Sequence, residues 1–172
     1  GRMWASEHVG GGAAPDIMCL AKGVAGGLPL GVTLAREEVM ASLGKGEHSS
    51  TFGGNPLVCA AASATLDVIQ EENLPKRASD LGNFFKEGLK QLQQRFRVVR
   101  ETRGLGLMLA MDLRFEVRDV LLGAVNRGVI YLYSGRTTLR FLPPLVIEKT
   151  RIDFALQVLD EMLAREEGKI RG

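Results

Sequence analysis

The sequence predicts an α/β protein built from two parts, and three observations support that prediction. From residue 97 onward, short apolar runs alternate with amphipathic helices, a pattern typical of a small α/β sandwich of about four strands. Two neighbouring helices, over 57–72 and 74–96, differ sharply in composition, so we place a domain boundary between them. The 172-residue chain is 45% hydrophobic and 24% charged, which is ordinary for a globular protein.

Before residue 56 the predicted elements are short and are joined by glycine-rich chain. The pattern predicts a turn near His8, a loop over 10–12, strands over 17–21 and 31–35, a helix over 36–43 and a loop over 44–55. The first strand is continuously apolar, so we expect it to be buried. The last loop is long and structureless, and such loops in compact domains are usually functional.

The helix over 57–72 has a clear start signal, because Asn55 suits the cap and Pro56 suits the first position. It is small or apolar on all sides, so we expect it to be buried or to bridge two bodies. The helix over 74–96 carries an apolar stripe on one face. Strands then follow over 98–101, 107–113, 129–133 and 138–142, with helices over 117–126 and 152–163.

Composition excludes several classes of function. The net charge of +2 and the 6% aromatic content give no basis for nucleic-acid binding. The two cysteines, Cys19 and Cys59, predict buried, reduced thiols, and the two histidines have no ligand-spaced partners, so we predict no metal site. No apolar run is long enough to span a membrane and no signal peptide is evident, so we predict a cytoplasmic protein without membrane contact.

One lysine stands out. The apolar run over 17–21 ends just before Lys22, and the loop that follows has glycine at 23, 26, 27 and 31. A lysine amine in a loop at the edge of a site can form a Schiff base with a carbonyl compound or with pyridoxal phosphate. The alternative is an ordinary solvated lysine.

Two further features could act with this lysine. The Ser50–Pro56 stretch feeds a helix N-terminus, which suits a phosphate, although a plain helix cap explains it equally well. Arg140 lies in the middle of an apolar strand, where a substrate carboxylate is a natural partner. Its alternative is an outward-facing arginine.

Taken in order, four motifs resemble the class III (ornithine-type) aminotransferases, which use pyridoxal 5'-phosphate on the fold-type I scaffold. The motifs are Leu20-Ala21-Lys22-Gly23 with the glycines that follow to 31, Ser50-Thr51-Phe52-Gly53-Gly54-Asn55-Pro56-Leu57, Arg103-Gly104-x-Gly106-Leu107-Met108, and Arg140-Phe141-Leu142-Pro143-Pro144-Leu145. Within the family, the 139–149 segment is most similar to acetylornithine and acetyl-lysine (LysW-linked lysine) aminotransferases. The resemblance implies that 1–55 ends the large cofactor-binding domain, that 56–73 is a bridging helix, and that 74–172 forms the small C-terminal α/β domain.

The resemblance also implies roles for single residues. Lys22 would hold pyridoxal phosphate as a Schiff base and shuttle a proton between Cα and C4′. Thr51 would bind the cofactor phosphate, usually in the active site of the neighbouring subunit of a homodimer, and Ser50 would lie near the substrate. Arg140 would bind the α-carboxylate of the amino donor and of 2-oxoglutarate in turn. The implied reaction moves the terminal amino group of N-acetylornithine or a blocked lysine to 2-oxoglutarate, in arginine or lysine biosynthesis.

The chain also departs from the family pattern. Family members carry an Asp-Glu-x-Gln-x-Gly-x-Gly-Arg run whose aspartate pairs with the cofactor's pyridine nitrogen, and Gly1-Arg2 resembles only its end. We therefore expect the 172-residue chain to be inactive by itself. Ala25 replaces the usual glycine, which would be strained in a left-handed conformation. Two alternatives remain: a 4-aminobutyrate or ornithine δ-aminotransferase, and a non-catalytic remnant that serves as a dimerisation or binding module.

Overall fold

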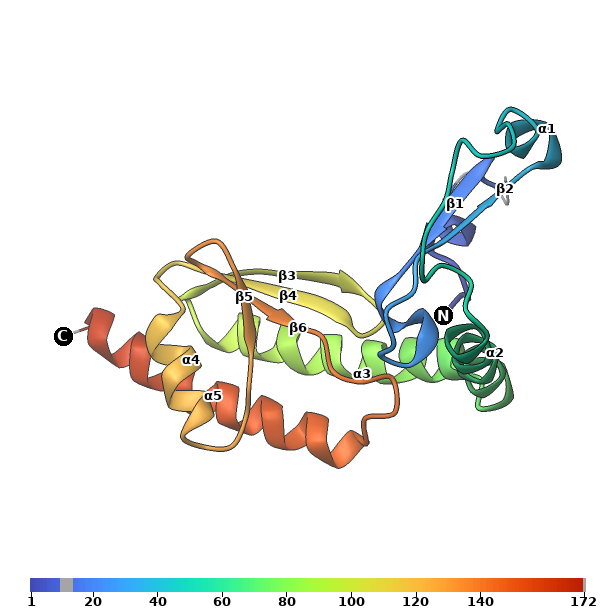
Figure 1. Ribbon diagram of the computed structural model, residues 1–172. Helices are drawn as coiled ribbons and strands as arrows, with labels where there is room; N and C mark the ends of the chain where they lie inside the picture. The colour runs from blue at the N-terminus through green and yellow to red at the C-terminus, as the bar shows by residue number, and fades with distance from the viewer. Residues whose placement is uncertain (10–13, 172) are drawn as a thin grey trace. The chain divides into compact units, whose positions relative to one another are not determined.

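The computed structural model describes residues 1–9 and 14–171, so the loop predicted over 10–12 lies outside the described residues. The chain divides into two compact units: an N-terminal unit, Arg2–Pro75, and a C-terminal unit, Gly1 with Lys76–Gly172 (Figure 1). The division falls at the start of helix α3 (Leu74–Arg95). No helix among the described residues combines the length and apolarity that crossing a membrane requires.

The N-terminal unit consists of short elements and one long helix. They are the 3₁₀ turn η1 (Ala5–His8), strand β1 (Ile17–Leu20), the 3₁₀ turn η3 (Lys22–Ala25), strand β2 (Val32–Ala35), helix α1 (Glu37–Met40) and helix α2 (Pro56–Glu71). The two strands pair antiparallel, with Leu20 opposite Val32, so η3 and the glycine-rich chain after it connect them. Both predicted strands are confirmed, whereas the helix predicted over 36–43 is shorter than expected.

Helix α2 begins where the sequence predicts. The side-chain Oδ1 of Asn55 accepts a hydrogen bond from the backbone N–H of Val58 at 3.0 Å, and Pro56 occupies the first turn. Turn η3 packs against this helix. A Cβ added to Gly26, just after the turn, would lie only 3.2 Å from Thr65 Oγ1 of α2. The start of α2 therefore fixes the loop before it, and the middle of the helix, at Thr65, packs against the turn.

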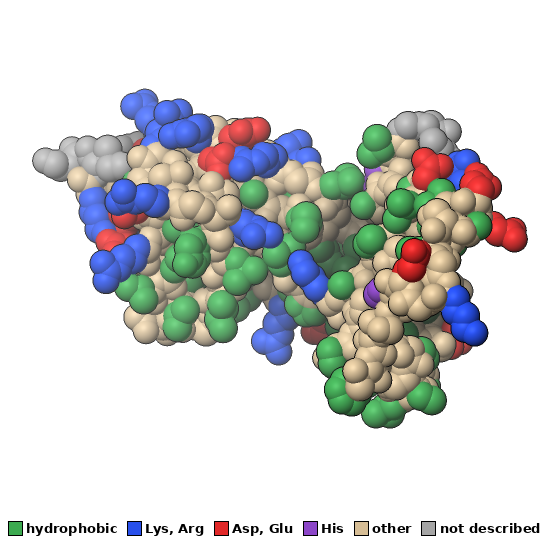
Figure 2. All heavy atoms as spheres, turned by 45° about the horizontal axis from the view of Figure 1, so that its top comes forward, with side chains coloured by type: hydrophobic (Ala, Val, Ile, Leu, Met, Phe, Trp, Pro, Cys, Tyr) green, Lys and Arg blue, Asp and Glu red, His purple; other side chains and the backbone are tan. Residues whose placement is uncertain are grey.

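Burial in the N-terminal unit differs from the prediction. Its buried hydrophobic residues are Ala25, Val58 and Leu74, whereas Ile17 of β1 is 56% exposed and Leu57 of α2 is 72% exposed. The two cysteines are free but exposed, so their predicted burial was wrong. Hydrophobic side chains accordingly appear on the surface of this unit in Figure 2. The physical reason is that the described residues of this unit supply no second layer to cover the β1–β2 pair or most of α2.

The C-terminal unit is a two-layer α/β sandwich. Its sheet contains β3 (Val99–Leu105), β4 (Met108–Leu113), β5 (Leu132–Ser134) and β6 (Thr138–Phe141), in the order β3-β4-β6-β5 and antiparallel throughout. Helices α3, α4 (Arg118–Val125) and α5 (Lys149–Arg171) accompany it, with α3 and α5 along one face of the sheet (Figure 1). The predicted sandwich is confirmed, although β3 is longer, β5 begins later and α5 is longer than the sequence pattern indicates.

The core of this unit lies between the sheet and its helices. Alternate residues of β4 (Leu109, Met111 and Leu113) are buried against the α3 stripe that includes Leu89 and against Leu159 of α5. The residues between them point to the opposite face, which these helices leave open. That open face therefore presents polar side chains of the β3, β4 and β6 strands.

The β3–β4 turn is held against α3 by a contact between two glycines. A Cβ built at Gly82 of α3 would lie 2.2 Å from the carbonyl carbon of Gly106, far inside any real contact distance. Gly106 itself has a φ of +55°, which favours glycine at this turn. Gly106 of the Gly104-x-Gly106 motif thus allows the β3–β4 turn to approach α3 closely.

Candidate active site

Lys22 leaves the end of β1 in an unusual backbone conformation. Its φ is +59°, in the left-handed region, which costs a non-glycine residue about 1–2 kcal/mol. The side chain is exposed, and no described residue forms a hydrogen bond or ion pair with its ammonium. An ordinary solvated lysine would not explain the strain, and backbone strain of this kind clusters at functional sites.

Ala25 does not show the backbone strain that a left-handed conformation would cause. Ala25 is buried within η3 and has no positive φ, whereas Gly26 just after it takes a φ of +62°. The substitution of alanine for the family's usual glycine therefore fits this turn without strain. Among the described residues, the other non-glycine residue with a positive φ is Asn73, at +48°, and asparagine adopts this conformation readily. Residue type therefore does not explain the left-handed backbone at Lys22.

The loop before α2 is held by its own side chains. Ser50 Oγ accepts a hydrogen bond from the Gly53 N–H at 3.0 Å, and Asn55 Nδ2 donates to the Phe52 carbonyl at 2.8 Å. The Thr51 hydroxyl is exposed and has no partner among the described residues. The loop thus offers a free hydroxyl just ahead of the positive end of a 16-residue helix, where an anion is stabilised.

Arg140 is placed on the open face of the sheet. It lies on β6 opposite Ala110 of β4 and Leu132 of β5, and it shares its face with Thr138, as strand alternation predicts. Arg140 is half-buried, and its guanidinium has no hydrogen-bond or ion-pair partner within the described part of the chain. It also lines a pocket of about 400 Å³ with Pro143 and Phe154. A free guanidinium of this kind can bind a carboxylate with two hydrogen bonds.

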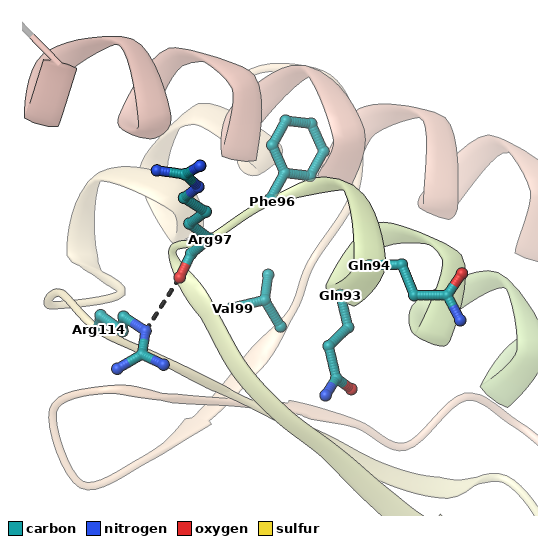
Figure 3. Close-up of a pocket in the computed structure, with 6 residues that line it drawn as sticks. All are labelled: Gln93, Gln94, Phe96, Arg97, Val99 and Arg114. Atoms are coloured by element: carbon teal, nitrogen blue, oxygen red, sulfur yellow. Dashed lines mark hydrogen bonds between the residues drawn. The ribbon is translucent and has the colours of Figure 1, made fainter.

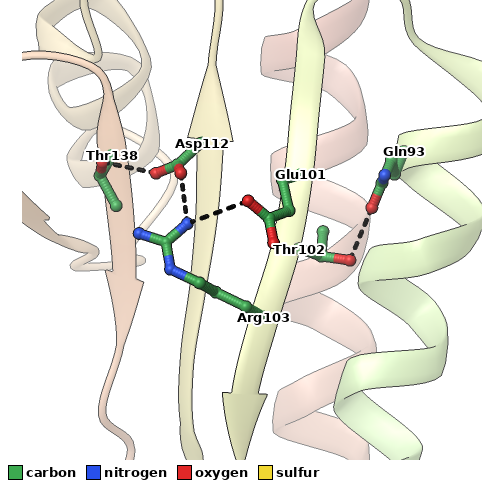
Figure 4. Close-up of polar contacts among 6 residues, drawn as sticks. All are labelled: Gln93, Glu101, Thr102, Arg103, Asp112 and Thr138. Atoms are coloured by element: carbon green, nitrogen blue, oxygen red, sulfur yellow. Dashed lines mark hydrogen bonds and ion pairs between the residues drawn. The ribbon is translucent and has the colours of Figure 1, made fainter.

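The same face of the sheet carries a polar cluster around Asp112, which Figure 4 shows; of its members, only Arg103 stood in a motif singled out from the sequence. Arg103 donates to Asp112 Oδ2, Thr138 Oγ1 donates to Asp112 Oδ1 at 2.6 Å, and Glu101 lies 3.8 Å from the Arg103 guanidinium. The hydrogen bond from Arg103 holds the pKa of the Asp112 carboxyl below its usual value. The available sequence signal was Asp112 and Thr138, polar residues within two largely apolar strands, but only the strand register brings them together.

A second pocket, of about 440 Å³, lies where α3 ends and β3 begins (Figure 3). It is lined by Gln93, Gln94, Phe96, Arg97, Val99 and Arg114, and Arg114 Nε donates to the Arg97 carbonyl at 2.9 Å. None of the residues singled out from the sequence lines this pocket. The candidate residues are therefore Lys22 and Thr51 of the N-terminal unit and, separately, Arg140 of the C-terminal unit.

These residues fit a cofactor that carries both a carbonyl and a phosphate. The N-terminal unit supplies an unpartnered amine at Lys22 and an unpartnered hydroxyl at Thr51, with Ser50 beside it. Arg140 belongs to the C-terminal unit, and its free guanidinium is a property of that unit alone. In the described part of the chain, no group of three or more histidine, cysteine, aspartate or glutamate side chains could hold a metal ion.

Comparison with known proteins connects this geometry to a family. The chain is 41% identical over 162 residues to the acetylornithine aminotransferase of Methanocaldococcus jannaschii, a match that covers 94% of this chain and 40% of that protein. It is 36% identical over 169 residues to the [LysW]-aminoadipate semialdehyde/glutamate semialdehyde transaminase of Sulfolobus acidocaldarius, covering 98% of this chain and 43% of that protein. The chain thus spans about 40% of the length of the curated relatives it matches.

Solved structures agree with the sequence relatives. The ornithine aminotransferase of Toxoplasma gondii, described with partial occupancy of pyridoxal phosphate at its active site, matches with a TM-score of 0.92. The match has 31% identity and covers 99% of this chain and 41% of that one, which confirms the predicted fold-type I assignment. The model of the aminotransferase class III family, whose members depend on pyridoxal phosphate, matches residues 1–163. The chain therefore belongs to the class III aminotransferases.

Proposed function

We propose that the whole protein is a pyridoxal-phosphate-dependent transaminase that moves the terminal amino group of N-acetylornithine or a blocked lysine to 2-oxoglutarate. The observation that carries the proposal is the left-handed, exposed and unpartnered Lys22 at the end of a strand. Relatives named acetylornithine aminotransferase and LysW-linked transaminase support the choice of donor.

Each residue then has a defined task. Lys22 would hold the cofactor through its amine, and its Nζ would then take the proton from the carbon that bears the substrate's amino group. When bound, pyridoxal phosphate withdraws electrons from that carbon and so makes the proton removable. Thr51 would bind the phosphate, Ser50 would lie near the substrate, and Arg140 would orient the carboxylate of each substrate in turn.

The domain assignment belongs to the same proposal. Residues 1–55 would end a large cofactor-binding domain, α2 would bridge, and 74–172 would form the small domain. The exposed apolar side chains of β1 and α2 support this, because such surface is normally covered in a whole protein. We propose that further chain of the large domain and the partner subunit of a homodimer cover it, with Thr51 completing the partner's site.

The first test is an activity assay on the protein expressed from its complete gene. Lys22→Ala should abolish amino transfer from N-acetylornithine to 2-oxoglutarate, because no other group replaces the amine that holds the cofactor. Lys45→Ala, which changes another exposed lysine of the same unit, should leave the rate unchanged. Transaminase activity that survives in Lys22→Ala would contradict the proposal.

A second candidate donor is ornithine, because the Toxoplasma gondii structure with the TM-score of 0.92 is an ornithine aminotransferase. A panel of N-acetylornithine, ornithine and 4-aminobutyrate, with identification of the amine that is consumed, distinguishes these donors. Absence of cofactor binding and of turnover with every amine would instead favour a non-catalytic dimerisation or binding module.

A further inference from the structure

The open face of the C-terminal sheet places one carboxylate between two arginines. Ala110 of β4 lies opposite Arg103 of β3 on one side and opposite Arg140 of β6 on the other. Asp112 follows two residues later on the same face, so it is the diagonal neighbour of both arginines. Diagonal neighbours are about 7–8 Å apart, within reach of long side chains. Asp112 could therefore pair with either arginine.

The structure shows which arginine holds it. Arg103 donates to Asp112 Oδ2 and Thr138 donates to Oδ1, so both carboxylate oxygens are engaged and the Asp112 side chain is only 18% exposed (Figure 4). Glu101 lies on the far side of the Arg103 guanidinium. Among the described residues, Arg140 has no corresponding partner, although it is as near to Asp112 in the strand register as Arg103 is.

We propose that Arg103 and Thr138 form a clamp on Asp112 that prevents this carboxylate from neutralising Arg140, so that Arg140 stays free for a substrate carboxylate. The inference rests on the proposed function, which assigns a carboxylate ligand to Arg140. Arg103, Thr138 and Asp112 are positioning residues in this scheme, because none of them touches the substrate. The clamp also explains why a strand arginine with an aspartate in reach is left unpaired.

The test measures binding of glutarate, a dicarboxylate without a carbonyl to react, to the protein expressed from its complete gene. Equilibrium dialysis with radiolabelled glutarate needs no turnover. Arg103→Gln should weaken binding about two- to fivefold, the range of a solvent-exposed ion pair, because the released Asp112 can now pair with Arg140. The double variant Arg103→Gln/Asp112→Asn removes the released charge and restores the wild-type net charge, so it should regain wild-type affinity.

A matched control is Arg136→Gln, which breaks an exposed ion pair with Glu116 in the same unit and should leave glutarate affinity unchanged. In the kinetic assay, Arg103→Gln should raise KM for 2-oxoglutarate and leave kcat unchanged, and the double variant should reverse that rise. A thermal melt of each variant verifies that it is folded.

Two results would overturn the clamp. The first is wild-type glutarate affinity in Arg103→Gln. The second is weakened glutarate binding in Arg103→Gln that the double variant does not restore, because that result indicates a merely structural role for Arg103. Arg140→Gln separates this failure from that of the proposed function. If Arg140→Gln loses glutarate while Arg103→Gln does not, the clamp is wrong and the role of Arg140 stands. If Arg140→Gln binds as well as wild type, the role of Arg140 and the clamp both fall.

Discussion

The contact between Gly82 and Gly106 gives a sharp prediction about stability. Replacement of Gly82 by alanine would place a Cβ 2.2 Å from the carbonyl carbon, 2.3 Å from the carbonyl oxygen and 2.6 Å from the Cα of Gly106. Each of these is a backbone atom, so no side-chain rotation relieves the clash. Helix α3 and the β3–β4 turn would have to separate until they reach the ordinary contact range, which begins at 3.4 Å.

The expected cost follows from two opposing effects. Overpacking costs about 1–3 kcal/mol, and the backbone clash at Gly82 should fall in the upper part of that range, about 2–3 kcal/mol, because no side-chain rotation relieves it. The higher helix propensity of alanine returns about 1 kcal/mol. We therefore expect Gly82→Ala to lower the free energy of unfolding by about 1–2 kcal/mol, which lowers Tm by about 2–8 °C in a chain of this size. Gly168→Ala is the matched control, because this glycine is also helical but a Cβ there meets nothing within 4 Å.

Thermal unfolding followed by circular dichroism distinguishes the two variants. Gly168→Ala should keep or raise Tm, because it gains helix propensity without a clash. A Tm for Gly82→Ala at or above that of wild type would refute the packing argument. That result would also mean that α3 and the β3–β4 turn can pack this closely without glycine at position 82. The strand that leads into this turn, β3, carries Arg103.

Three further variants test other parts of the structure. Leu139→Ala removes a fully buried side chain and should cost about 2–5 kcal/mol in urea unfolding, whereas Leu122→Ala at a 56% exposed position should change stability by less than about 0.5 kcal/mol. Asn55→Ala removes the cap of α2 and should cost about 0.5–2 kcal/mol, in contrast to Asn83→Ala on the exposed side of α3; equal effects would contradict the capping role. The pKa of Asp112 is lowered in the folded state, so its stabilising contribution is present above pH about 4 and is lost as the pH falls further. Melts across this range should show wild type and Asp112→Asn differing above pH about 4 and converging in acid, and a constant difference would contradict the ion pair.

Local signals in the sequence predicted most of the fold. The sandwich followed from helical and strand periodicity, and the start of α2 followed from Asn55 and Pro56, because both kinds of signal act over a few neighbouring residues. The burial of β1 could not be predicted in this way. An apolar strand is buried only if a second layer covers it, and the described residues of the N-terminal unit supply none.

The sequence motifs named candidate residues but could not indicate the geometry around them. Lys22, Thr51 and Arg140 were identified from their motifs, yet no pattern in the sequence indicates the left-handed backbone at Lys22. The sequence also carried no sign of the hydrogen bonds that Asp112 accepts from residues of two other strands. Its partners lie 9 and 26 residues away along the chain, and only the pairing of β3, β4 and β6 brings them together.

The measurement that tests the central claim most directly asks which lysine holds the cofactor. The protein expressed from its complete gene is incubated with pyridoxal phosphate, reduced with sodium borohydride, digested and analysed by mass spectrometry. The account predicts a phosphopyridoxyl group on Lys22 and no modified peptide from Lys22→Ala. An unmodified Lys22 with the group on another lysine, such as Lys45, would contradict it.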